Sequence, residues 1–77
     1  MRVSPRALST LASLIGRPMT CAELARQMGI HRSAAHRHLR RLRARGLVER
    51  RRTHRKWIYY HATAKGHVAV TGSAPAE

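Results

Sequence analysis

Arginine dominates the chemistry that this sequence could do. Its 77 residues contain 16 Lys and Arg against 3 acidic residues, a formal net charge of +13 with the six histidines neutral. A guanidinium can donate two parallel hydrogen bonds to a guanine edge or a phosphate, whereas an ammonium acts as a point charge. Because so few acids compensate, the charge indicates an anionic partner: nucleic acid first, with an anionic membrane surface as the competitor. A GC-rich codon bias is the other explanation for the excess of Arg over Lys.

The other reactive side chains do not form a catalytic pattern. The three carboxylates, Glu23, Glu49 and Glu77, are too far apart in the sequence to form an acid pair or a hard-metal site. We find no glycine-rich phosphate loop and no Ser/His/Asp grouping. His31, His36 and His38 fall on different sides of one helix, which favours free or phosphate-contacting histidines over a metal site. We therefore expect a protein that is not an enzyme and has no cofactor or metal.

Cys21 is the only cysteine, so it can neither close an intrachain disulfide nor anchor a Cys-based zinc site. This suggests a reducing, intracellular compartment. We expect Cys21 to be structural, but its place near a helix N-terminus could lower its pKa, which leaves a redox role open. No apolar run is long enough to span a membrane and no signal peptide is recognisable, so we expect a cytoplasmic protein without membrane contact.

The first helix predicted by the sequence covers residues 5–16. Ser4 offers an N-cap and Pro5 suits the first helical position. Leu8, Leu11 and Ile15 recur at helical spacing with Leu14 beside them, and Gly16 and Pro18 end the pattern.

A helix-turn-helix is predicted next. Thr20 and Glu23 have the spacing of a capping box, which begins a helix of about eight residues ending at Gly29. After a short turn, a second helix runs from Arg32 to about Arg45. Its apolar stripe consists of Ala35, Leu39 and Leu42. The opposite face carries Ser33, Arg37, Arg40 and Ala44, with His36 on one edge and Arg41 on the other.

After Gly46 the pattern favours a β-hairpin, with strands near 47–52 and 56–62. Ile58, Tyr60 and Ala62 should face the core, and Trp57, Tyr59 and His61 should face outward. We expect Trp57 to pack partly against a neighbouring element, with a dimer or partner contact as the alternative. A short helix from Thr63 to about Val70 follows, although Gly66 weakens it, and residues 71–77 should form a flexible tail.

Three segments carry a resemblance to known proteins: 20–31 (TCAELARQMGIH), 33–50 (SAAHRHLRRLRARGLVER) and 57–66 (WIYYHATAKG). Together they resemble winged helix-turn-helix transcriptional regulators of the MarR and ArsR type from bacteria and archaea. The resemblance covers about residues 19–66. It is fairly specific for the fold and much less so for any one family.

The resemblance implies binding of double-stranded DNA, with helix 32–45 in the major groove and the basic segment 50–56 along the minor groove or backbone. Arg32, Ser33, His36 and Arg37 would lie nearest to base edges. The full set of expected DNA-binding residues is Thr20, Arg32, Ser33, His36, Arg37, Arg40, Arg41, Arg50, Arg51, Arg52, His54, Arg55 and Lys56.

The sequence also departs from these regulators. His31 and Ala34 stand where similar proteins often carry Ser or Thr, so we expect the recognition helix to lack a good N-cap. MarR-like chains are longer, with added helices that build a dimer and an inducer pocket, and ArsR-type metal sites have no match here. We expect neither a small-molecule effector nor metal sensing.

We therefore predict a mainly helical α+β fold: a winged helix-turn-helix over residues 1–70 with a three-helix core, a two-stranded wing and a short C-terminal helix. The expected function is that of a small sequence-specific DNA-binding transcriptional regulator, working as a homodimer because one module of this size has limited specificity. Two alternatives stay open: a charge-driven DNA- or RNA-binding accessory protein, and a winged-helix adaptor for an acidic protein partner.

Overall fold

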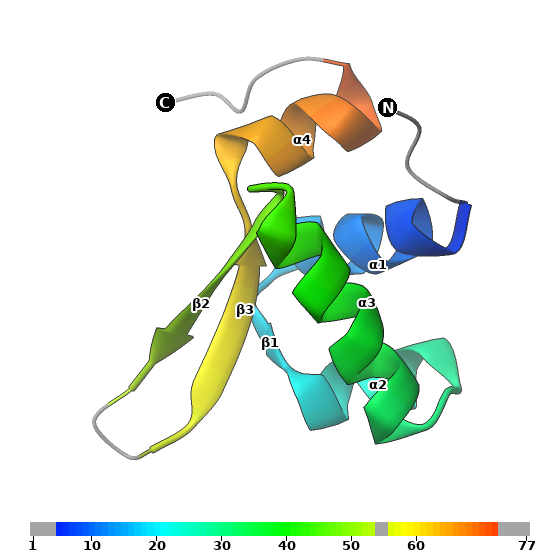
Figure 1. The fold of residues 1–77 in the computed structure, drawn as a ribbon, viewed down its shortest axis with the longest axis vertical. Helices are drawn as coiled ribbons and strands as arrows, with labels where there is room; N and C mark the ends of the chain where they lie inside the picture. The colour runs from blue at the N-terminus through cyan, green and yellow to red at the C-terminus, as the bar shows by residue number, and fades with distance from the viewer. Residues whose placement is uncertain (1–4, 54–55, 73–77) are drawn as a thin grey trace.

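Four helices and three short strands make up the computed structural model, which describes residues 5–53 and 56–72. The elements are α1 (Pro5–Gly16), β1 (Met19–Thr20), α2 (Cys21–Met28), α3 (Arg32–Ala44), β2 (Val48–Arg52), β3 (Ile58–Ala62) and α4 (Ala64–Thr71). Helices α1, α2 and α3 lie on one side of the β2–β3 hairpin, which we call the wing (Figure 1). The predicted helix-turn-helix and wing are confirmed. Among the described residues, no helix has the length and apolar character needed to cross a membrane.

The sheet has three strands rather than the two expected from the sequence. Its order is β1-β3-β2, and both pairings are antiparallel. Met19 pairs with Tyr60 and Thr20 with Tyr59, so the segment that leads into α2 is hydrogen-bonded to the wing. This pairing fixes the position of the helix-turn-helix relative to the wing.

The core lies between the first three helices and the inner face of the sheet. Ala35, Leu39 and Leu42 of α3 are almost completely buried, which confirms the predicted stripe of that helix. Tyr60 is buried from the sheet side, with Ile58 and Ala62 packed against the same cluster, as expected.

The buried face of α1 differs from the prediction. It is formed by Thr10, Leu11 and Leu14, while Leu8 and Ile15 are only partly buried. Thr10 can be fully buried because its hydroxyl donates to the Arg6 carbonyl at 2.9 Å, so the polar group keeps a partner.

Helix α4 begins as predicted and continues to Thr71. Thr63 caps it by accepting from the Gly66 N–H at 3.1 Å. A Cβ atom on Gly66 would overlap the Leu47 carbonyl oxygen, so glycine here allows α4 to approach the start of the wing closely. Gly66 is thus a packing requirement and not a weakness of the helix. Of the predicted tail, residues 73–77 lie outside the described residues, as does Ser4, the predicted cap of α1.

Candidate DNA interface

Helix α3 begins with a cap that the sequence pattern does not indicate. His31 is its N-cap, and the His31 Nδ1 accepts from the Ser33 N–H at 3.1 Å and lies 2.8 Å from the Ser33 hydroxyl oxygen. The expectation that α3 lacks a good N-cap is therefore wrong. An imidazole nitrogen replaces the hydroxyl or carboxylate oxygen that usually satisfies the first free N–H groups of a helix.

The start of α2 has its own cap and one hydrogen bond to α3. The predicted capping box is present: the Glu23 N–H donates to the Thr20 hydroxyl at 3.1 Å, and the Thr20 N–H donates to the Glu23 carboxylate at 2.9 Å. The Cys21 thiol donates to the Arg32 carbonyl at 3.5 Å, which joins the first residues of the two helices. Gly29 leaves α2 in the left-handed conformation, as expected.

The environment of Cys21 argues against the redox role that the sequence left open. Burial raises the pKa of the Cys21 thiol, and the nearby positive charge of Arg32 only partly opposes this. A thiol with a raised pKa carries little thiolate, and thiolate is the reactive form. The contact that Cys21 makes is its hydrogen bond to the Arg32 carbonyl.

Most of the expected DNA-binding side chains lie at the surface. On α3 and in the wing, the exposed members of the set are Arg32, Ser33, His36, Arg37, Arg40, Arg41, Arg50, Arg51, Arg52 and Lys56. Thr20 is only 9 % exposed. Its hydroxyl oxygen already accepts the Glu23 N–H in the capping box, but its O–H could still donate to a phosphate. His54 and Arg55 lie outside the described residues.

The three consecutive arginines of the wing do not share one face. Arg50 pairs with Tyr60 and Arg52 with Ile58, so these two arginines are on the core side of the sheet. Arg51 pairs with Tyr59 on the opposite side, where it lines a shallow groove with Arg17 and other residues. The predicted cluster is therefore divided into two parts.

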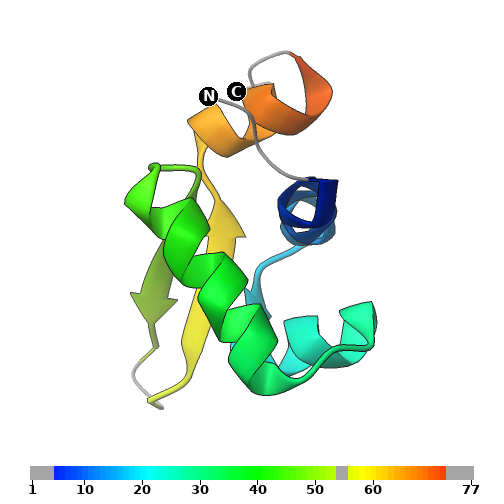
Figure 2. The ribbon, with the colours of Figure 1, turned by 45° about the vertical axis from the view of Figure 1, so that its right-hand side comes forward.

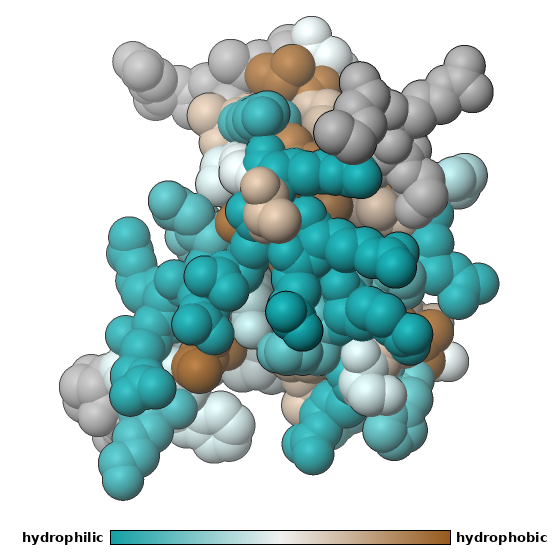
Figure 3. All heavy atoms as spheres, in the orientation of Figure 1, coloured by the Kyte–Doolittle hydropathy of each residue, from teal (hydrophilic) through white to brown (hydrophobic). Residues whose placement is uncertain are grey.

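The N-terminal end of α3 and the far end of the wing lie at the same end of the molecule. Figures 1 and 2 show both ends directed away from α4. In the space-filling view, hydrophilic side chains cover the face over α3 and extend to the wing (Figure 3). A rod-shaped polyanion could contact both elements simultaneously.

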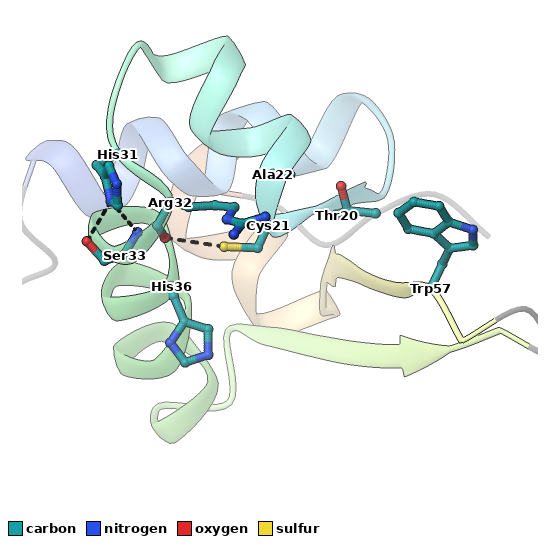
Figure 4. Close-up of a pocket in the computed structure, with 8 residues that line it drawn as sticks. All are labelled: Thr20, Cys21, Ala22, His31, Arg32, Ser33, His36 and Trp57. Atoms are coloured by element: carbon teal, nitrogen blue, oxygen red, sulfur yellow. Dashed lines mark hydrogen bonds between the residues drawn. The ribbon is translucent and has the colours of Figure 1, made fainter.

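A groove lies between the start of α2, the start of α3 and the turn end of the wing, just before β3 (Figure 4). We call it the Thr20–Trp57 groove. Trp57 forms one side of the groove and is 58 % exposed, so most of its surface is open to solvent and the rest is covered. The residues that line the groove are Thr20, Cys21, Ala22, His31, Arg32, Ser33, His36 and Trp57.

The described histidines and acids do not gather into a candidate metal site: no group of three or more potential ligands occurs among these residues. His31 and His36 are exposed, and His38 is partly buried. Burial lowers the pKa of His38, and the positive charges of Arg6, Arg37 and Arg41 lower it further. The lowered pKa favours the neutral form of His38.

Comparison with known proteins agrees with this geometry. A sequence model of the MarR family matches residues 3–56, more than half of the chain. The chain belongs to the MarR family. Among curated relatives it is similar to the nodulation protein NolR of Rhizobium meliloti, with 34 % identity over 70 residues. That alignment covers 91 % of this chain and 57 % of NolR.

Solved structures of this MarR-family fold superpose closely. The multiple antibiotic resistance repressor MarR aligns with a TM-score of 0.86 at 21 % identity, covering 94 % of this chain and 54 % of that protein. The transcriptional regulator BldR from Sulfolobus solfataricus aligns with a TM-score of 0.85 at 26 % identity, and the alignment covers 94 % of this chain and 53 % of BldR. Streptococcus pneumoniae FabT, solved in complex with DNA, aligns with a TM-score of 0.81 at 20 % identity, and the alignment covers 86 % of this chain and 48 % of FabT. The chain therefore spans about half the length of the proteins that it matches.

Proposed function

We propose that this chain is a transcriptional regulator, rather than an enzyme, that binds double-stranded DNA. The N-terminal half of α3 enters the major groove, and residues 50–56 of the wing lie along the minor groove or the backbone. The observation that carries the proposal is the arrangement of two separate cationic elements at one end of the molecule (Figures 1 and 2). Membership of the MarR family and the fold shared with DNA-bound FabT support it.

Each element has its own role in this proposal. Arg32, Ser33, His36 and Arg37 occupy the exposed first turns of α3, where side chains reach base edges in a helix-turn-helix complex. Arg40 and Arg41 follow one turn later, at positions suited to phosphate. The wing arginines supply further phosphate contacts, which hold the protein in register but read no sequence.

Competition binding tests sequence-specific recognition. The chain should prefer one duplex over unrelated duplexes and structured RNA in gel shifts at rising salt. Replacing both Arg37 and Arg40 with Ala should abolish that preference without unfolding the domain, because both side chains are exposed. Lys65→Ala, on α4 at the opposite end of the molecule, removes one positive charge and its hydrogen bond to the Arg45 carbonyl, and controls for loss of charge outside the proposed interface.

The alternatives predict different outcomes of the same experiment. Equal affinity for every duplex and RNA would identify a charge-driven accessory protein instead of a regulator. Absence of binding to any nucleic acid would contradict the proposal and favour an adaptor for an acidic protein. If preference survives the loss of Arg37 and Arg40, then neither of these two arginines reads the sequence.

We further propose that the protein acts as a homodimer in the cytoplasm of a bacterium or an archaeon, or of a phage host. A single module of this size has limited specificity, and two modules related by a two-fold axis read twice the sequence. Selection of bound duplexes from a random pool should yield a palindrome with half-sites about one helical turn apart. A single unrepeated half-site would contradict the homodimer.

A further inference from the structure

Trp57 stands out on the surface of this molecule. Only Trp57 and Val68 are large apolar side chains classed as exposed in the described segments 5–53 and 56–72. Exposing an indole to water is unfavourable, and an exposed aromatic beside cationic groups is typical of a binding surface. The DNA contacts proposed above make no use of Trp57.

The backbone holds Trp57 in a defined place. The Thr53 N–H donates to the Trp57 carbonyl at 2.8 Å, and the Lys56 N–H donates to the Thr53 carbonyl at 3.1 Å. Lys56 adopts a φ of 70°, a left-handed conformation that disfavours a residue with a side chain. Because these bonds keep Lys56 in that conformation, Trp57 leaves the turn in a fixed direction.

The Thr20–Trp57 groove combines two kinds of wall. Arg32 and His36 of α3 form a side that is basic, and Trp57 lies across from them beside Thr20 (Figure 4). Ala22 adds a small apolar surface. The lining includes no carboxylate, so an anionic chain could enter without repulsion from an acidic side chain.

The sugar–phosphate backbone of DNA fits both walls. Its phosphates accept hydrogen bonds from guanidinium and hydroxyl groups, and its deoxyribose rings present apolar faces to aromatic side chains. A flipped base would also stack on Trp57, but extruding it from a duplex requires unstacking. A second copy of this chain offers this groove no matching charge, because a symmetric contact here would place the same basic wall against itself.

We propose that Trp57 is an uncharged DNA contact that packs against a deoxyribose of the strand crossing the Thr20–Trp57 groove. The contact sets the depth at which the first turn of α3 enters the major groove. It joins the wing and the recognition helix on one DNA strand. This inference rests on the proposed DNA-binding function.

The protein carries its own probe for this contact, because Trp57 is its only tryptophan. Titration with a mixed-sequence duplex of about 24 base pairs, which covers two turns of the major groove, should change Trp57 emission as sites fill. Fluorescence anisotropy of an end-labelled copy of the same duplex measures binding independently of Trp57.

Substitutions separate the apolar contact from charge. Trp57→Ala should weaken binding about tenfold, the effect of burying roughly 60 Å² of apolar surface. The slope of log affinity against log salt should stay unchanged, since no charge is removed. Trp57→Phe should restore most of the affinity. Val68→Ala, which truncates the other exposed apolar side chain, on α4, is the matched control and should bind like the parent.

The two measurements distinguish failure of this inference from failure of the proposed function. Anisotropy that reports binding, with unchanged Trp57 emission and full affinity of Trp57→Ala, overturns the Trp57 contact and leaves DNA binding intact. Anisotropy that reports no binding overturns both. A Trp57→Ala variant that loses self-association in sedimentation but keeps its affinity shows that Trp57 contacts another copy of the chain, which also overturns the inference.

Discussion

Single side chains determine how the recognition helix α3 begins. His31 accepts the Ser33 N–H, and Cys21 donates to the carbonyl of Arg32, so two consecutive residues at this helix start are held by side-chain contacts. An undistorted first turn matters because Arg32, Ser33 and His36 all project from it. Contacts of this kind stabilise a helix end and preserve the geometry of the proposed interface.

The cap at His31 can be tested by two substitutions. His31→Ala should destabilise the domain by about 1 kcal/mol, the usual effect of removing an N-cap, whereas His31→Asn keeps a capping group and should change stability little. Urea unfolding measures both. Equal stability of His31→Ala and the parent would mean that the Ser33 N–H gains nothing from the imidazole.

His38 should make the stability of the fold depend on pH. Its pKa is lowered mainly by burial, so the folded protein favours the neutral form more than the unfolded chain does. This contribution to stability is fully present above the ordinary histidine pKa of about 6.5 and decreases as the pH falls toward the lowered folded-state pKa. His38→Gln should therefore show a smaller loss of thermal stability than the parent between neutral and mildly acidic pH. An identical pH dependence in the two proteins would contradict the assignment.

Two features at the residue scale could not be predicted from the sequence, for physical reasons. Histidine is not among the preferred capping residues. His31 caps α3 only because its ring is oriented toward the Ser33 N–H, and a sequence does not reveal that orientation. Thr10 reads as polar, yet its hydroxyl donates to the Arg6 carbonyl in its own helix and can then be buried. The capping box at Thr20 and Glu23 was predictable because both partners belong to one local motif.

At the scale of elements, α4 is packed onto the start of the wing through Gly66. Gly66→Ala should destabilise the fold by about 2 kcal/mol, because the new methyl group meets the Leu47 carbonyl, whose backbone cannot move freely. Gly16→Ala is the control, since a Cβ there meets nothing within 4 Å. Thermal unfolding of the two variants should give clearly different midpoints, and similar midpoints would disprove the close approach.

The wing should contact DNA through one face more than the other. Arg50→Ala and Arg52→Ala should each reduce the magnitude of the salt slope by about 1, as expected when a phosphate contact is lost. Arg51→Ala removes the same charge from the opposite face of the sheet and should change the slope less. A larger effect of Arg51 than of its two neighbours would place the DNA on the outer face.

The helices and the hairpin were predictable because their signals are local: capping residues, glycines at helix ends and a change in hydrophobic period. Strand β1 was not, because a strand of two residues has no period of its own and exists only through its pairing with Tyr59 and Tyr60. The division of Arg50, Arg51 and Arg52 between two faces likewise depends on the register of the sheet. The orientation of Trp57 depends on the turn before it, where Lys56 takes an unusual conformation.

At the scale of the whole molecule, the fold converts an excess of charge into a shaped surface. Ten of the 16 Lys and Arg lie between residues 37 and 56. The described ones among them belong to α3, to its connection with the wing and to the wing itself, and the starting turn of α3 and the far part of the wing share one end of the molecule (Figure 1). A charge spread evenly over a domain of this size would bind any polyanion weakly. This arrangement instead allows a duplex to be contacted by α3 and by the wing at the same time.

The salt dependence of duplex binding tests the central claim most directly. If α3 and the wing together neutralise some six phosphates, the slope of log affinity against log salt should be on the order of −5 for a preferred duplex. The double variant Arg50→Ala and Arg52→Ala should flatten that slope while the fold stays intact. A slope near zero, or a steep slope that these substitutions leave unchanged, would contradict a two-part electrostatic contact with DNA.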